Sequence, residues 1–141
     1  GRLDTIQASI LIKKLGHLDD WCDKRRQKAL YYTEKMKGFD LVTPKIMRFN
    51  KHVFHQYVIR VKERDRLMEH LQANNIGCAG YYPVPQHLQE CMADLGYKEG
   101  DMPETEKAAK ETLALPVFPE ITREEQDYVI ESIKDFFSAS A

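Results

Sequence analysis

The chain has 141 residues, 43% hydrophobic and 30% charged, and its 21 basic and 22 acidic residues give a net charge of −1. A chain of this length can bury about two-thirds of its unfolded surface, enough for one domain or part of a larger one. The balanced charge argues against a nucleic-acid-binding protein, and no apolar run is long enough to span a membrane. We therefore expect neither a nucleic-acid nor a membrane partner. Three scattered cysteines are too few for a disulfide scaffold, so we expect a cytoplasmic protein.

The N-terminal third of the chain has the pattern of an amphipathic helix. Apolar residues recur at three- and four-residue spacing over residues 3–22 and again over 29–36. We therefore predict one long helix that is bent or weakened at Gly16 and that stops at Gly38. The helical pattern begins with no cap and no lead-in, which indicates a fragment of a longer protein.

Three short strands are predicted after this helix, at residues 39–42, 53–61 and 76–82. The middle strand alternates most clearly, and His55 falls on its apolar face together with Tyr57 and Ile59. We therefore expect His55 to be a buried, structural histidine.

Further helices are predicted around these strands. Asp65 and Pro103 mark two helix starts, the second helix running to Leu115, and Thr122 with Glu125 forms a capping box for a third. A short helix covers residues 88–95. A long helix, a small sheet and covering helices together make a two-layer α/β sandwich.

The stretch of residues 78–89, CAGYYPVPQHLQ, is unusual for a connection. Its two prolines each fix φ and push the preceding residue to extended geometry, so the stretch forms a rigid arm. Tyr81 and Tyr82 stand at one end of the arm, and His87 and Gln89 stand at the other. Aromatic faces with hydroxyl tips suit a ring-shaped polar ligand such as a sugar, and a strand end whose tyrosines pack under the prolines is the alternative. In a strand, the two tyrosines would point to opposite sides.

The sequence contains no complete catalytic or metal motif. His52 and His55 are separated by an odd offset in a strand, which directs their side chains to opposite faces. His87 and Cys91 could share a helix face, but two ligands do not make a site, so we predict no metal. Phosphate-binding glycine loops and nucleophile motifs are also lacking.

Seven short motifs nevertheless occur in an order and at spacings typical of one family. They are GRLDTIQA at residues 1–8, Trp21 with Arg25-Arg26, HVFHQYVIR at 52–60, Tyr82-Pro-Val-Pro with His87, Leu95-Gly-Tyr with Gly100-Asp, Pro103 with Glu106, and Leu115-Pro-Val-Phe-Pro. On these motifs the whole chain resembles the C-terminal part of the DegT/DnrJ/EryC1/StrS family of sugar-nucleotide aminotransferases.

The resemblance implies a fold and a chemistry. Residues 1–141 would form the small domain of a fold-type I aminotransferase, with a small, mainly antiparallel sheet, and the large domain with the pyridoxal 5'-phosphate lysine would be absent. Family members are homodimers that move an amino group from an amino acid, usually glutamate, to a keto group of a nucleotide-linked sugar, for polysaccharides or glycosylated metabolites. We assign no catalytic residue and no Schiff-base lysine here, neither Lys13 nor Lys14, so the fragment alone is expected to be inactive. The rival hypothesis is a non-catalytic dimerisation or regulatory module derived from that family.

The resemblance also implies the substrate-binding residues. Arg2 matches an arginine that reaches across the dimer, and its forked charge suits a diphosphate or carboxylate. Tyr81 and Tyr82 match a pair at the sugar, and His87 matches a histidine that either binds substrate or braces the loop. Weaker candidates are His55 and Gln56.

Overall fold

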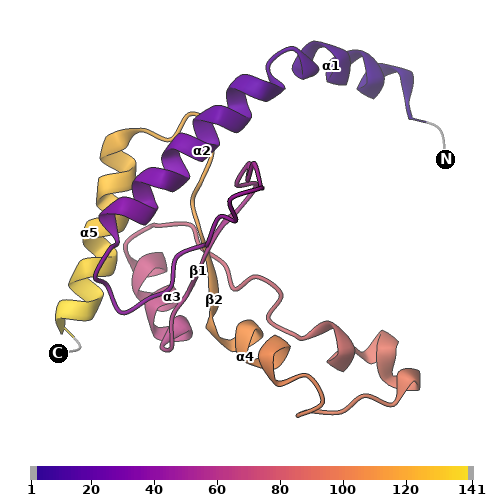
Figure 1. Ribbon diagram of the computed structural model, residues 1–141, viewed down its shortest axis with the longest axis vertical. Coiled ribbons are helices and arrows are strands. Elements are labelled where there is room, and N and C mark those ends of the chain that lie inside the picture. The colour runs from indigo at the N-terminus through magenta and orange to yellow at the C-terminus, as the bar shows by residue number, and fades with distance from the viewer. Residues whose placement is uncertain (1–2, 140–141) are drawn as a thin grey trace.

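The computed structural model describes residues 3–139 and confirms the α/β class, with helices around a small antiparallel sheet (Figure 1). Strands β1 (Tyr57–Arg60) and β2 (Thr112–Leu115) form this sheet. The other elements, in chain order, are α1 (Thr5–Leu15), α2 (Leu18–Lys35), α3 (Arg64–Ala73), the 3-10 helices η1 (Gln86–Leu88) and η2 (Glu90–Leu95), α4 (Pro103–Glu111) and α5 (Arg123–Ala139). No helix in this described range is long and apolar enough to cross a membrane.

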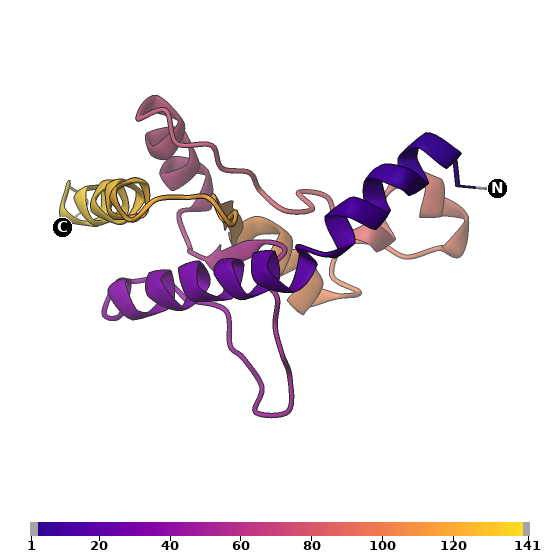
Figure 2. The same cartoon turned by 90° about the horizontal axis from the view of Figure 1, so that it is seen from above.

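The predicted N-terminal helix is interrupted where the glycine was expected to weaken it. Helix α1 ends at Leu15 and α2 begins at Leu18, so Gly16 and His17 form the break. The expectation of an uncapped start is wrong, because the Asp4 side chain accepts hydrogen bonds from the first turn of α1, including one of 2.9 Å from the N–H of Ile6. Helix α1 extends away from the core, and none of its residues is buried (Figure 2).

The sheet differs from the one predicted. Strand β2 pairs with β1 in antiparallel register, with Leu113 opposite Ile59. The residues of β2 were predicted to form the end of a helix instead. A run of four residues is too short for its period to distinguish a strand from a helix, and the pairing with β1 decides it. The predicted strands at 39–42 and 76–82 are reduced to single bridges, Val42 to Arg60 and Ala79 to Ala114.

The prediction that His55 is buried is wrong, because β1 begins at Tyr57, four residues after the predicted start of the strand at residue 53. Phe54 has a φ of 49° and is 0% exposed, whereas the next residue, His55, is exposed. The bend lets the larger apolar ring enter the core and breaks the alternation that would have carried the histidine inward. Tyr57 and Ile59 are buried as predicted.

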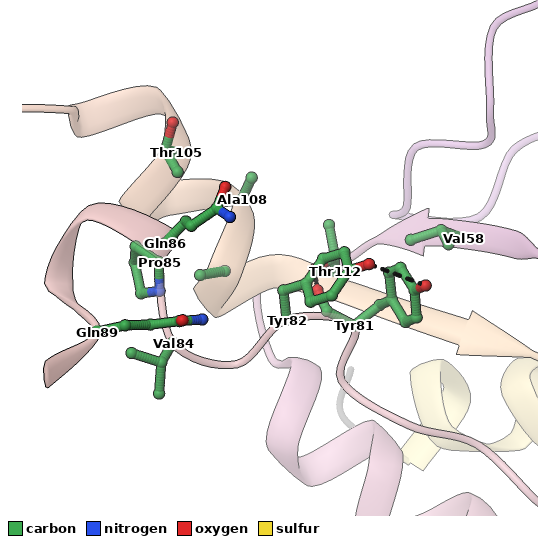
Figure 3. Close-up of a pocket in the computed structure, with 11 residues that line it drawn as sticks. Val58, Tyr81, Tyr82, Val84, Pro85, Gln86, Gln89, Thr105, Ala108 and Thr112 are labelled. Carbon is green, nitrogen blue, oxygen red and sulfur yellow. Dashed lines mark hydrogen bonds between the residues drawn. The ribbon is translucent and has the colours of Figure 1, made fainter. Parts of the chain in front are cut away.

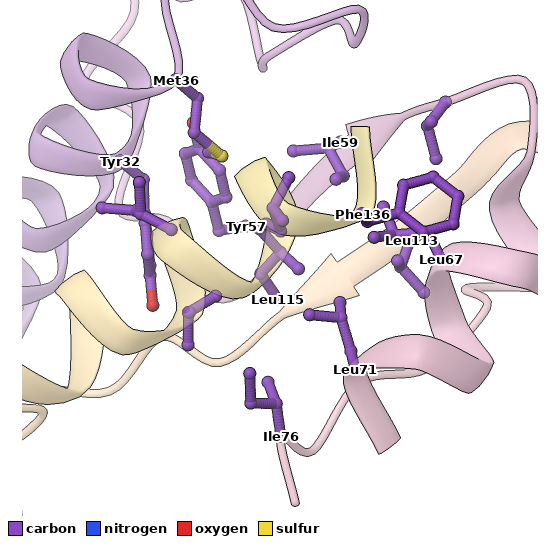
Figure 4. Close-up of a cluster of buried hydrophobic side chains, with 14 of the residues drawn as sticks. Tyr32, Met36, Tyr57, Ile59, Leu67, Leu71, Ile76, Leu113, Leu115 and Phe136 are labelled. Carbon is purple, nitrogen blue, oxygen red and sulfur yellow. The ribbon is translucent and has the colours of Figure 1, made fainter. Parts of the chain in front are cut away.

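The hydrophobic core lies where the sheet meets α2, α3 and α5 (Figure 4). Tyr32 of α2, Leu71 of α3, Leu113 of β2 and Phe136 of α5 all belong to it. The predicted capping box of α5 is confirmed: the N–H of Thr122 donates to Glu125 at 2.7 Å, and the N–H of Glu125 donates to Oγ1 of Thr122 at 3.1 Å. Helix α3 begins at Arg64, one residue before the predicted cap Asp65, which pairs with that arginine instead.

Candidate functional site

A cavity of about 510 Å³ opens between the arm, α4 and the start of β2 (Figure 3). Its volume lies in the range typical of small-molecule sites. Among the described residues, those that line it are all uncharged: Val58, Tyr81, Tyr82, Val84, Pro85, Gln86, Gln89, Thr105, Ala108, Ala109 and Thr112. The cavity therefore suits a neutral ligand surface with a few hydrogen-bonding groups.

Both tyrosines of the arm lie at this cavity, on the same side, so the expectation of opposite orientations is wrong. Tyr82 has a φ of 59°, in the left-handed region, and the two ring centroids are 4.2 Å apart. The hydroxyl of Tyr82 donates to that of Tyr81 at 3.2 Å, which raises the pKa of Tyr82 above its ordinary value (Figure 3). The bend thus gathers two aromatic faces and two hydroxyls at one place, with Tyr82 67% exposed.

A buried arginine fixes the base of the arm. Arg64 is buried, and its Nη1 donates to the carbonyl of Thr112 at 3.3 Å. Thr112 in turn donates through Oγ1 to the carbonyl of Tyr81 at 3.2 Å. The backbone at Gly80 passes so close that a Cβ there would lie 2.3 Å from Nη1 of Arg64. A larger residue at this position would therefore displace the guanidinium of Arg64.

Gly80→Ala is expected to lower the free energy of unfolding by about 1–3 kcal/mol, because the methyl group must displace a buried guanidinium from its carbonyl partner. Urea denaturation followed by circular dichroism measures the change. Gly77→Ala is the matched control, since a Cβ at Gly77 meets nothing within 4 Å. Equal stability of the two variants would show that Arg64 does not hold the arm.

His87 lies behind the cavity wall, buried rather than lining it. Its Nε2 is 3.1 Å from Oε1 of Glu106 on α4, and the exposed fractions of the two side chains are 4% and 11%. Burial disfavours the charged form of Glu106, but hydrogen bonds from Gly100, His87 and Met102 outweigh it and lower the pKa of this carboxyl. Glu106 is thus ionised near neutral pH and accepts all of these bonds.

The sequence candidates His55 and Gln56 lie outside the cavity. Both residues precede β1, and Arg2 falls outside the described residues. The α4 wall of the cavity was not predicted from the sequence. Its signal was the three- and four-residue spacing of Thr105, Ala108 and Ala109, which places small residues on one face of α4.

The described residues do not by themselves fit pyridoxal phosphate. A Schiff base needs a lysine held in the site, yet no lysine lines the cavity and none of the lysines in residues 3–139 is buried. The same range holds no group of three or more metal-ligating side chains. Within this chain the cavity can bind and orient a ligand, and it lacks the groups for the transfer chemistry.

The model of the DegT/DnrJ/EryC1/StrS aminotransferase family matches residues 1–134. The chain is 51% identical to the "Pleiotropic regulatory protein" of Geobacillus stearothermophilus and 36% identical to the dTDP-3-amino-3,6-dideoxy-alpha-D-galactopyranose transaminase of Aneurinibacillus thermoaerophilus, each match covering 96% of this chain. S. venezuelae DesV aligns with a TM-score of 0.93 and 33% identity over 96% of this chain. The chain spans 37% of the length of each of these three proteins.

Proposed function

Because the chain belongs to the DegT/DnrJ/EryC1/StrS aminotransferase family, we propose that it is the substrate-binding C-terminal part of a sugar-nucleotide aminotransferase. In this proposal the whole enzyme transfers an amino group from an amino acid, glutamate in the first instance, to a keto group of the nucleotide-linked sugar. The large domain outside this chain holds the pyridoxal 5'-phosphate and its lysine, which supply the electron sink for the transfer. The enzyme is a cytoplasmic homodimer that serves polysaccharide or glycosylated-metabolite synthesis.

The observation that carries the proposal is the pairing of Tyr81 and Tyr82 at one uncharged cavity. Aromatic faces and hydroxyls suit the ring and the hydroxyls of a hexose. The uncharged lining suits the sugar better than the diphosphate, so the diphosphate would meet cations elsewhere, Arg2 among them. In this proposal His55 and Gln56 contact substrate groups that extend beyond the cavity.

Helix α1 supports the proposed domain organisation. Apolar side chains are exposed just before it and along it: Leu3, Ile6, Ile10, Leu11, Ile12 and Leu15. Exposed apolar side chains gathered on one helix are typical of a contact with another protein surface. We propose that the large domain covers it, in keeping with the 37% share of the relatives' length that this chain spans.

The test compares the 141-residue chain alone with the protein that also carries the large domain. Borohydride reduction of the 141-residue chain with pyridoxal phosphate is expected to give no stoichiometric adduct, because no lysine stands at the cavity. The protein that carries the large domain should give one adduct on a lysine of that domain, and should aminate a dTDP- or UDP-linked keto-hexose with glutamate. Mass spectrometry locates the adduct. A stable adduct on one lysine of this chain would refute the domain assignment.

A non-catalytic regulatory module is the second candidate, and the 51% identical relative named as a regulatory protein favours it. The same experiment discriminates. A protein with the large domain that dimerises, yet neither binds a sugar nucleotide nor reacts with glutamate, would support the regulatory role.

A further inference from the structure

Three segments of the chain meet at the carboxylate of Glu106. The N–H of Gly100 donates to both of its oxygens, at 2.9 and 3.0 Å, and the N–H of Met102 donates to Oε1 at 3.3 Å. His87 of η1 completes the set at 3.1 Å, and its ring lies edge-on to that of Tyr97, with centroids 6.2 Å apart. One buried side chain therefore ties η1, the turn before α4 and α4 itself together.

The same segments carry the walls of the cavity. Gln86 adjoins His87 and lines the cavity from η1, and Gln89 follows on the same segment. Thr105 adjoins Glu106 and lines the cavity from α4. Neither His87 nor Glu106 lines it. The contact between His87 and Glu106, on the side of the walls away from the cavity, therefore sets the distance between η1 and α4.

The contact between His87 and Glu106 joins two segments that are far apart in the sequence. The two residues are 19 positions apart, and the intervening segment holds η2 and two turns with glycines at positive φ, Gly96 and Gly100. No strand pairing in the described range connects η1 to α4. Side-chain bonds, rather than a backbone ladder, hold the walls in place.

We propose that His87 and Glu106 are positioning residues that hold η1 against α4 at the separation a nucleotide-linked hexose requires, without touching it. The inference rests on the proposed function for the identity of the ligand. Since misplacement of a binding wall weakens orientation of the bound ring, the pair controls affinity for the sugar nucleotide and leaves the amino donor unaffected.

The experiment uses the protein that carries the large domain. His87→Phe keeps a ring beside Tyr97 and removes the bond to Glu106, and it should raise KM for a dTDP- or UDP-linked keto-hexose about tenfold, with the glutamate half-reaction unchanged. Glu106→Gln keeps an oxygen that accepts from His87 and from the backbone, and this variant should retain most of the wild-type affinity. Glu104→Gln, exposed on the same helix, is the matched control. Calorimetric titration with the sugar nucleotide gives a readout independent of turnover.

Amide hydrogen exchange of residues 84–89 in the 141-residue chain gives a readout that needs no ligand. Faster exchange in His87→Phe, and unchanged exchange in Glu104→Gln, would support the pair. If the wild-type enzyme binds no sugar nucleotide, the proposed function fails, and this exchange measurement alone decides whether the pair holds the wall. Normal sugar-nucleotide affinity together with normal exchange in a folded His87→Phe would overturn the proposal. If that variant does not fold, Glu106→Ala, which removes the acceptor of His87 altogether, is compared with Glu104→Ala, and equal affinity and equal exchange would also overturn it.

Discussion

Leu113→Ala is expected to destabilise the chain by about 2–5 kcal/mol, the range found for removal of a large aliphatic side chain from a closed core. Leu113 is 0% exposed, faces Ile59 across the sheet, and clusters with Leu67 and Phe136 (Figure 4). Truncation removes packing from the sheet and from two helices at once. A loss of this size is a large fraction of the about 5–15 kcal/mol that holds a typical domain folded.

Urea denaturation followed by circular dichroism measures this effect. Phe49→Ala is the control, because Phe49 is 88% exposed on the loop between α2 and β1, which Figure 2 shows extending from the body. Its free energy of unfolding should change by no more than about 0.5 kcal/mol. Comparable losses in the two variants would mean that β2 does not lie in the core.

Replacing both Tyr81 and Tyr82 by alanine in the protein that carries the large domain should weaken sugar-nucleotide binding on the order of 10- to 100-fold. Each lost aromatic contact or hydrogen bond contributes about 0.5–1.5 kcal/mol, and about 1.4 kcal/mol is tenfold in affinity. The glutamate half-reaction should change little, since the amino donor carries neither the sugar nor the nucleotide. Stability should change little at Tyr82, because its side chain is largely exposed.

Single Tyr→Phe variants separate the rings from the hydroxyls. Tyr82→Phe removes the donor of the 3.2 Å bond to Tyr81 and keeps the stacking face. Tyr128→Phe, an exposed tyrosine whose hydroxyl donates to the carbonyl of Asn74 outside the cavity, is the control. Calorimetry with the sugar nucleotide gives the affinities. Early unfolding of the double variant with normal affinity at low temperature would assign these tyrosines to the fold instead.

Local patterns in the sequence determined several elements of this structure. The three- and four-residue periodicity located α2 and α5, and Thr122 with Glu125 marked the start of α5. Gly16 identified the break between the first two helices. These features depend on residues within about one or two helical turns of each other, so the sequence pattern contains their physical cause. The ordered motifs likewise identified the family, whose model matches residues 1–134.

The tertiary structure alone decided the features that depend on distant segments. Strand β2 is a strand because β1, more than fifty positions earlier, offers its backbone groups. Phe54 rather than His55 enters the core because the bend before β1 fits the larger ring there. Tyr81 and Tyr82 face one cavity because Arg64 and Thr112 hold the arm, and His87 is buried because Glu106 meets it from α4. Each of these outcomes depends on a contact between residues far apart in the chain, and no local periodicity contains such a contact.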